Sequence, residues 1–391
     1  MVRTVRVPSL AVPAAALAAG ILLGAGLAGV AVHEPARAAT TGTVSDAGPR
    51  RAGGTADGVR AVLPGLVAFV EDARGLEFRR EVDVELLDDD AFQERLGSSD
   101  DEARKEIEDA QAVLQAMGLV APGLDLVAAV DRFAGEAVLG FYDAETDELV
   151  VRGMAATPLV RTTLVHELVH ALEDQHFDLD RPDLGDEEAA AFQALAEGSA
   201  AVVEERYVDS LSPSERRAAE GAELARGRAL PGDVPEVVQI AFGFPYVFGP
   251  DLVRALLEAG GQERLDQAFA EPPRSTEHVL EPARYLAGDD PRPVRQPPAD
   301  RPAFDDGEIG ALFLILMLRA ELTDRQAGEA AQGWGGDRYV AWRDGERACV
   351  RMSFVMDTPR DADELEDALA DWAAERPRSA SASGLSLRTC G

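Results

Sequence analysis

The stretch LVHELVHALEDQHF, residues 164–177, constrains the fold of this chain more than any other. Its apolar residues recur at helical spacing and form one arc: Leu164, Val165, Leu168, Val169 and Leu172. Three of the chain's five histidines lie in the same stretch: His166, His170 and His176. The pattern predicts a helix with one face in the core and a polar face along the edge of a cleft.

The histidines at positions 166 and 170 are spaced for a metal site. On a helix, residues four apart project about 40° apart around the axis, so both imidazoles can reach one ion. Glu167 follows the first histidine, which completes the motif H-E-x-x-H. In this motif two histidines bind zinc, and the glutamate acts as base toward the water that zinc activates. We predict that His166 and His170 are ligands of Zn²⁺ and that Glu167 is the catalytic base.

A catalytic zinc needs a third protein ligand and keeps one position open for water. Glu197 lies in ALAEGSAAVVEERY, residues 194–207, on a second predicted helix. The loop after the first helix is long enough for this helix to return beside it, and Glu197 is the predicted third ligand. His176 is the alternative, because its spacing matches the metzincin pattern H-E-x-x-H-x-x-G-x-x-H. Glu173 replaces the glycine at which the helix would have to end.

Three motifs together resemble a poorly characterised group of secreted bacterial zincin-like proteins: HELVHALEDQHF (166–177), PPRSTEHVLEPARY (272–285) and GWGGDRY (333–339). The resemblance covers most of the chain from about residue 60. The tetrad Glu197-Gly198-Ser199-Ala200 resembles the E-G-x-A of gluzincins, zinc peptidases whose third ligand is a glutamate on a second helix. The last two of the three motifs indicate no chemistry of their own.

The resemblance implies a zincin-like fold, in which the active-site helix lies under a small sheet whose edge strand pairs with extended peptide. The sequence departs from the pattern of the better-known gluzincins at one position. Thermolysin-like enzymes carry an acid four residues after the ligand glutamate, and this acid orients a ligand histidine. Ala201 occupies that position here, and Asp174, four residues after His170, is the candidate substitute.

Periodicity along the rest of the chain predicts an α+β fold with segregated elements. We expect a long loop over 270–303, and Asp305 and Asp306 as caps of an apolar helix at 311–318. The C-terminal part is expected to be ββαβ-like. The predicted elements are a strand at 81–88, a helix at 101–118, a hairpin at 137–153, helices at 187–208 and 361–375, and strands at 338–344, 348–356 and 385–390.

The N-terminus resembles a secretory signal peptide, residues 1–39, with Arg3 and Arg6 before an apolar run and a small-x-small site at Ala36–Ala38. Retention of residues 10–32 as a membrane anchor is the alternative, and no further segment is expected to reach spanning length. The predicted organisation continues with a flexible linker (40–56), a zincin-like catalytic region (57–260) and a C-terminal region (261–391).

The net charge and the two cysteines narrow the class of protein further. The formal net charge of −33 repels nucleic acid, so we expect no nucleic-acid partner. Cys349 and Cys390 are the two cysteines of an exported chain, and they are expected to form one structural disulfide.

The sequence therefore predicts an exported zinc metallopeptidase that acts on a peptide or protein substrate. A zinc- or peptide-binding protein without catalysis, and a zinc hydrolase of a non-peptide amide or ester, are the alternatives. The developing oxyanion needs a donor besides the metal. The candidate donors are His278, Tyr285, Arg338 and Tyr339.

Overall fold

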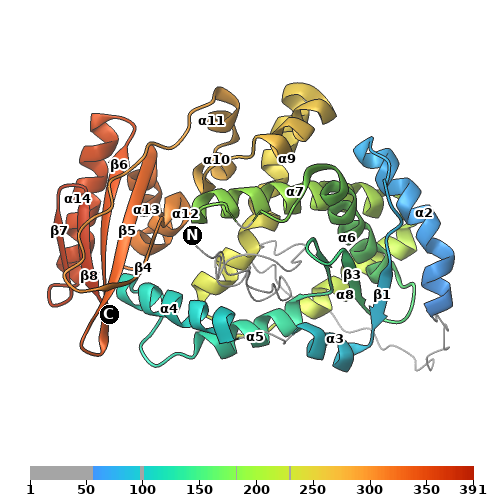
Figure 1. Cartoon of the computed structure of the whole chain (residues 1–391), viewed down its shortest axis with the longest axis horizontal. Coiled ribbons are helices and arrows are strands. Elements are labelled where there is room, and N and C mark those ends of the chain that lie inside the picture. Colours follow the sequence, from blue (N-terminus) through green and yellow to red (C-terminus); the bar gives the residue numbers. More distant parts are fainter. Residues whose placement is uncertain (1–55, 97–100, 182, 229) are drawn as a thin grey trace, which may run out of the picture.

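The structure is a computed structural model that describes residues 56–96, 101–181, 183–228 and 230–391. Helices predominate, and the strands form two separate sheets toward opposite ends of the long axis (Figure 1). The expected α+β class is confirmed at this level. The predicted signal peptide, and all of the predicted linker except Ala56, lie outside the described residues.

The first sheet has three strands in the order β1 (Val84–Leu87), β3 (Glu148–Arg152), β2 (Gly140–Asp143). The expected hairpin is β2 and β3, and β1 adds to it in parallel with β3. The buried side chains of β3 pack on helix α6 (Pro158–Phe177), which lies beside helix α2 (Ala56–Arg74). Strand β2 therefore forms one edge of a sheet that covers the histidine-bearing helix.

Helix α6 begins and ends where its sequence indicates. The Thr157 hydroxyl accepts a hydrogen bond from the Val160 N–H at 3.2 Å, and Pro158 occupies the first turn, where its missing N–H costs nothing. The helix ends at Phe177, because Asp178 adopts a positive φ of 60°.

Helix α7 (Asp186–Ser210) returns beside α6 and packs extensively on helix α9 (Glu236–Ala270). Residues 209–269, where periodicity predicted no element, form helix α8 (Pro213–Gly227) and most of α9. Between α2 and α6 the chain also forms helices α3 (Asp89–Leu96), α4 (Asp101–Met117) and α5 (Leu126–Ala137).

By length and composition α9 is apolar enough to cross a membrane, although we expected no such segment beyond residues 10–32. Half of its apolar window is buried inside the fold.

The second sheet has five strands in the order β4-β5-β6-β8-β7. The predicted ββαβ elements are β5, β6, helix α14 (Pro359–Glu375) and β8, to which β4 and β7 are added. Helices α12 (Gly310–Arg319) and α13 (Asp324–Ala331) lie between β4 and β5 in the chain. The strands are β4 (Ala303–Gly307), β5 (Trp334–Asp344), β6 (Arg347–Met356), β7 (Ala380–Ser383) and β8 (Ser386–Cys390).

Two expectations for the region before this sheet were wrong. The segment 270–303 contains two short helices, α10 (Thr276–Leu280) and α11 (Pro282–Ala287), before it becomes irregular. Asp305 and Asp306 lie in β4 and do not cap the apolar helix. The carboxylate of Asp337, on β5, accepts hydrogen bonds from Ile309 N and Gly310 N at 2.8 Å, so a distant residue caps α12.

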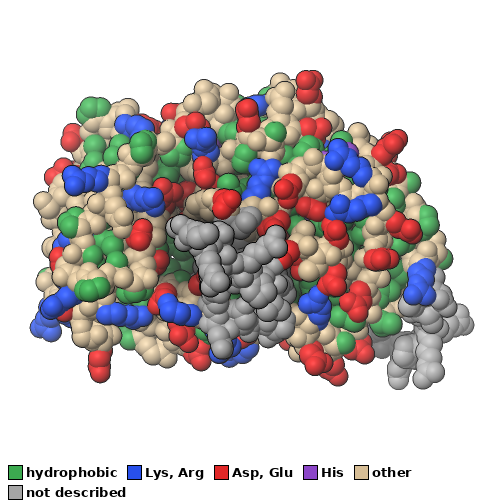
Figure 2. Space-filling view, viewed as in Figure 1, with side chains coloured by type: hydrophobic (Ala, Val, Ile, Leu, Met, Phe, Trp, Pro, Cys, Tyr) green, Lys and Arg blue, Asp and Glu red, His purple; other side chains and the backbone are tan. Residues whose placement is uncertain are grey.

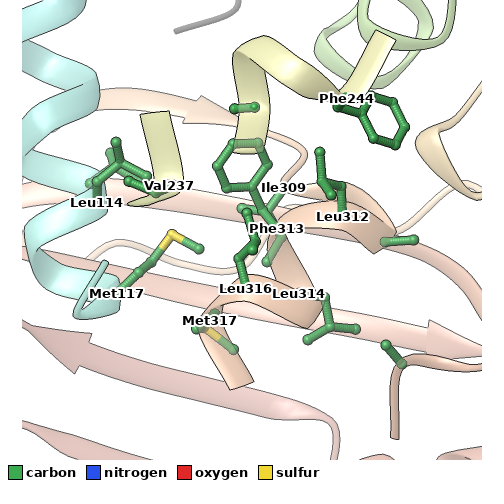
Figure 3. Packing of buried hydrophobic residues seen from close by; sticks show 14 of the residues in the cluster. Leu114, Met117, Val237, Phe244, Ile309, Leu312, Phe313, Leu314, Leu316 and Met317 are labelled. Carbon is green, nitrogen blue, oxygen red and sulfur yellow. The ribbon is translucent and has the colours of Figure 1, made fainter. Parts of the chain in front are cut away.

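One hydrophobic core joins the two predicted regions. Side chains from α4, α9 and α12, among them Leu114, Val237 and Phe313, meet in it (Figure 3). The predicted boundary at residue 260 falls inside α9, where Gly260 and Gly261 interrupt the helical backbone.

The two motifs for which the sequence indicates no chemistry, residues 272–285 and 333–339, form hydrogen bonds with the first turns of helices. Glu187, at the start of α7, accepts hydrogen bonds from the Thr276 N–H at 2.8 Å and from its hydroxyl at 2.9 Å. Burial raises the pKa of Glu187 to about 8, so at neutral pH this interior carboxyl is largely neutral. Thr276 belongs to the motif at 272–285, and Asp337 belongs to the one at 333–339. Both motifs therefore have a structural role at the base of the second sheet.

The excess of acidic residues does not gather in one patch on the face seen in Figure 2. Asp and Glu side chains are spread over it, with Lys and Arg between them. On this face the acidic residues are therefore distributed over the surface and do not mark one site.

The predicted disulfide between Cys349 and Cys390 is present. The two cysteines are directly opposed on β6 and β8, and they lie among Val340 and Trp342. The bond therefore ties the last strand to the centre of the second sheet.

We predict that Cys349→Ser lowers the melting temperature while zinc content stays unchanged. The bond spans a separation of 41 residues, and closing a loop of that size stabilises by roughly 3–4 kcal/mol in the chain-entropy model. Differential scanning calorimetry and metal analysis test this. Cys390→Ser is the matched control, because it breaks the same bond and should shift the melting temperature equally. Two alkylatable thiols in the native wild-type protein would contradict the assignment.

Candidate metal centre

Three predicted ligands converge between α6 and α7. The Nε2 atoms of His166 and His170 lie 3.0 Å and 3.2 Å from the same oxygen of Glu197, Oε2. One ligand atom from each residue lies within 4.8 Å of the others. In the described part of the chain this is the one group of three or more histidine, cysteine or acidic residues with such spacing. All three side chains are largely shielded from solvent.

Glu197 reaches the histidines because α7 is held tightly in place on its other side. The neighbouring Gly198 contacts Gly249 of α9, backbone against backbone. A Cβ added at Gly198 would lie 2.3 Å from the carbonyl carbon of Gly249, far inside van der Waals contact. The second position of the E-G-x-A tetrad therefore has a packing role that requires glycine.

A carboxylate that the sequence analysis missed orients one of the histidines. The Nδ1 of His166 lies 3.1 Å from Oε2 of Glu204. A proton on Nδ1 hydrogen-bonded to Glu204 leaves Nε2 free to bind a metal ion, as is usual for metal-ligating histidines. Glu204 follows Glu197 by seven residues, two turns along the same face of α7. That spacing is the signal in the sequence, whereas the thermolysin-like pattern places the acid at the fourth position.

The charge balance of the cluster fits a cation. Burial lowers the pKa of His166, but hydrogen bonds to Glu197 and Glu204 outweigh it and raise the pKa well above its usual value. For Glu197, burial raises the pKa, but His170 and His166 outweigh it and lower the pKa. The buried carboxylate thus needs positive charge from the direction of the imidazoles. Two imidazole nitrogens and one carboxylate oxygen are also a donor set of catalytic zinc sites.

Glu167 is buried beside this cluster and retains free hydrogen-bonding capacity. It is 7% exposed, and none of the hydrogen bonds found among the described residues involves its carboxylate. Burial is the largest effect on this group and raises its pKa. Gly140 of β2 allows the strand to lie close, since a Cβ there would be 3.1 Å from Cγ of Glu167 and 2.9 Å from Thr163.

Tyr246 of α9 is a second residue that the sequence analysis missed. Its ring centroid lies 6.1 Å from that of His166. Burial, followed by the charges of Glu197 and Glu167, raises the pKa of the Tyr246 hydroxyl well above its usual value. The hydroxyl is therefore a proton-bearing donor beside the cluster at any physiological pH.

One of the three candidate ligands, His166, lines a cavity of about 690 Å³. His166, Glu167 and Tyr246 line it together with Leu139 and Gly140 of the edge-strand side. Its other walls come from α5, α7, α8 and α9. The volume is in the range of small-molecule and peptide side-chain sites.

The structure places the alternative ligand elsewhere. His176 lies near the end of α6, where its Nε2 is 2.9 Å from the Glu77 carbonyl oxygen. Helix α6 runs through Glu173, whose buried carboxylate accepts hydrogen bonds from Arg74 and Ser199. The helix therefore does not turn back as the metzincin pattern requires.

Asp174 does not orient a histidine. Its carboxylate accepts hydrogen bonds from the Tyr142 hydroxyl and from Leu179 N, both at 2.9 Å. The carboxylate that lies beside a histidine of the cluster is that of Glu204.

None of the four predicted oxyanion donors lines the cavity. His278 is fully buried and its Nε2 lies 2.8 Å from the Asp289 carbonyl oxygen, while Tyr285 donates to the Glu271 carbonyl oxygen. The other two pair with acids in the second sheet region: Arg338 with Glu308 and Tyr339 with Asp305.

We predict that His170→Ala abolishes zinc binding at neutral pH and that Glu197→Ala weakens it severely, because each removes one of three converging donors. His176→Ala is the matched histidine control and should retain zinc. Metal analysis after dialysis, with circular dichroism to verify folding, measures this. Loss of zinc in His176→Ala together with retention in Glu197→Ala would overturn the ligand assignment.

We also predict that Glu204→Gln weakens zinc affinity by about 10- to 100-fold, the usual effect of losing a partner of a ligand histidine. Glu205→Gln is the control, since Glu205 is exposed and pairs with Arg254 at 2.6 Å. A competition titration against a chelator compares the two. Equal affinities for both variants would show that Glu204 does not orient His166.

The comparisons with known proteins concern a different part of the chain. A family model described as a domain of unknown function (DUF8575) matches residues 300–388, which hold the second sheet and helices α12–α14. No curated protein and no solved structure gives a significant match. The matched segment includes none of the residues of the candidate centre.

Proposed function

We propose that this protein is an exported zinc-dependent metallopeptidase of gluzincin type. The observation that carries the proposal is the convergence of His166, His170 and Glu197 beside the buried carboxylate of Glu167, at the wall of a cavity. A zinc site with a purely structural role has four protein ligands. The described residues bring three together here, with a base beside them.

Zinc, when bound by these residues, supplies a Lewis acid that acidifies water and polarises a substrate carbonyl. The chain supplies the proton transfers. Glu167 accepts a proton from the attacking water as the water oxygen bonds to the carbonyl carbon. The carbon–nitrogen bond then breaks, and Glu167 passes the same proton to the departing amine. Burial raises the pKa of Glu167, which helps the carboxyl to hold the proton between the two transfers.

Tyr246 is our candidate for the donor that the developing oxyanion requires. Its hydroxyl stays protonated beside Glu197 and Glu167, and Tyr246 lines the cavity that a substrate would enter. A fixed donor in a site shielded from water stabilises such a charge more than it would in bulk solvent.

The edge strand supports a peptide as the substrate. β2 pairs with β3 on one side, and no described strand pairs with its other side. Gly140, on this strand, and Leu139, just before it, line the cavity. An extended peptide added to this edge would form backbone hydrogen bonds and lie across Glu167.

We predict that Glu167→Gln retains zinc but loses hydrolysis by about 10²–10⁴-fold, since an amide cannot accept the proton of the water. The assay is a digest of a broad peptide library by the zinc-loaded protein, read by mass spectrometry. The control is Glu188→Gln, because Glu188 lies on α7 away from the cavity. Glu173 is less suitable, because it lies in the buried core. Cleavage by Glu167→Gln at the wild-type rate would exclude this mechanism. Absence of cleavage by the wild type, with zinc bound, would favour a binding protein.

A further inference from the structure

The walls of the cavity combine apolar surface with acidic groups. The apolar residues are Ala137, Leu139, Leu159, Ala201, Val208, Leu224, Leu230 and Pro250. The acidic residues apart from Glu167 are Glu136, Glu204, Glu205, Asp209 and Glu223. A ligand that fits such walls has a long aliphatic portion and a polar end.

Four of these five acidic side chains either have a partner in the described chain or are exposed to solvent. Glu204 interacts with His166, Glu205 pairs with Arg254, and Asp209 pairs with Arg216 at 3.2 Å. Glu136 is exposed. Each of these four carboxylates is thereby accounted for without a ligand.

Glu223 of α8 is the exception. Its Oε1 is shielded from solvent, and no described residue forms a hydrogen bond with it. Burial, followed by the charges of Glu204 and Glu220, raises the pKa of Glu223 to about 7. A buried carboxylate oxygen without a donor is costly, and a positive group entering from the cavity would remove that cost.

A metal ion is a poor candidate for this positive group. Glu223 and Glu204 are not part of any described cluster of three or more ligand atoms within 4.8 Å. A lysine or arginine side chain fits both the apolar walls and the unpartnered carboxylate, because its methylene stem packs on apolar residues while its head bonds to a carboxylate.

Two arginines line the same cavity and could instead favour an acidic ligand. The Nη2 of Arg226 donates to the Glu136 carbonyl oxygen at 2.9 Å, but its Nε is shielded from solvent and has no hydrogen-bond partner among the described residues. The charges acting on Arg226 are Arg152 of β3, Asp89 of α3 and Glu136 of α5. Arg228 is exposed at the end of α8. Two buried atoms without a partner in the described chain therefore line the cavity, and Glu223 carries the one on which a charge of the candidate centre, Glu204, acts.

We propose that Glu223 is a specificity-determining residue, and that the protein prefers peptides with arginine or lysine next to the scissile bond. The inference rests on the proposed peptidase function, because it assigns the substrate class of the same cavity. Two buried groups that line the cavity, Glu167 and the Oε1 of Glu223, lack hydrogen bonds within the described chain. Glu167 would act on the peptide bond, and Glu223 would bind the side chain next to that bond.

The test compares matched peptides that carry arginine, citrulline or norleucine on either side of the cleaved bond. We expect the wild type to favour arginine over norleucine in kcat/KM by about 10- to 100-fold, the range for a hydrogen bond to a charged group. Glu223→Gln should remove most of this ratio, and Glu223→Arg should shift the preference toward glutamate. Glu220→Gln is the control, since Glu220 is exposed on the same helix one turn away, and it should keep the wild-type ratio.

A binding measurement separates the two proposals. Calorimetry with zinc-loaded Glu167→Gln should show tighter binding of the arginine peptide than of the norleucine peptide, without turnover. If that preference is present but the wild type cleaves nothing, the peptidase function fails and the subsite stands. If the wild type cleaves arginine and norleucine peptides equally, or favours acidic ones, the subsite is overturned and the peptidase function stands.

Discussion

The backbone contact between Gly198 and Gly249 is the constraint on which the candidate centre depends. Side chains at these positions would force α7 and α9 apart. The contact fixes α7 at the residue after Glu197, so it sets how far the ligand carboxylate reaches toward α6. It also fixes α9 one turn after Tyr246, which places that hydroxyl over the same carboxylate. One helix crossing thus positions both a candidate metal ligand and the candidate oxyanion donor.

Behind the histidines, a buried ionic network fixes α6 against its neighbours. The Nε of Arg74, on α2, donates to Glu173 at 2.7 Å, and Ser199 of α7 donates to the same oxygen. Both Arg74 and Glu173 are fully shielded from solvent. A buried pair is weak evidence for stability, but removing one partner would leave an uncompensated charge. The network therefore acts mainly on geometry: Glu173 is one turn from His170 and Ser199 is two residues from Glu197, so it limits sliding between the two ligand helices.

The parts of this arrangement that follow from local spacing could be predicted from the sequence. The histidine pair follows from helical periodicity, and Glu204 could have been found by extending the same period from Glu197. The parts created by tertiary contact could not be predicted. Tyr246 is far along the chain from Glu197, and only the helix crossing brings it close. Asp305 and Asp306 have the residue type of a helix cap, yet Asp337 caps α12 because the fold of the second sheet brings β5 to that helix.

Helix α7 connects the two halves of the molecule, and its two ends serve different purposes. Its first turn is anchored near the second sheet, where Glu187 accepts hydrogen bonds from Thr276 of α10 and Asp186 accepts one from Glu308 N, just after β4, at 3.1 Å. Farther along, it carries Glu197 and Glu204 at the candidate centre (Figure 1). The sheet that matches the family model is thus a support for the ligand helix. A helix held at one end by buried hydrogen bonds, and in its middle by backbone contact, has little freedom to rotate. Such fixed placement is what a site needs if its carboxylates are to keep their positions while a substrate enters.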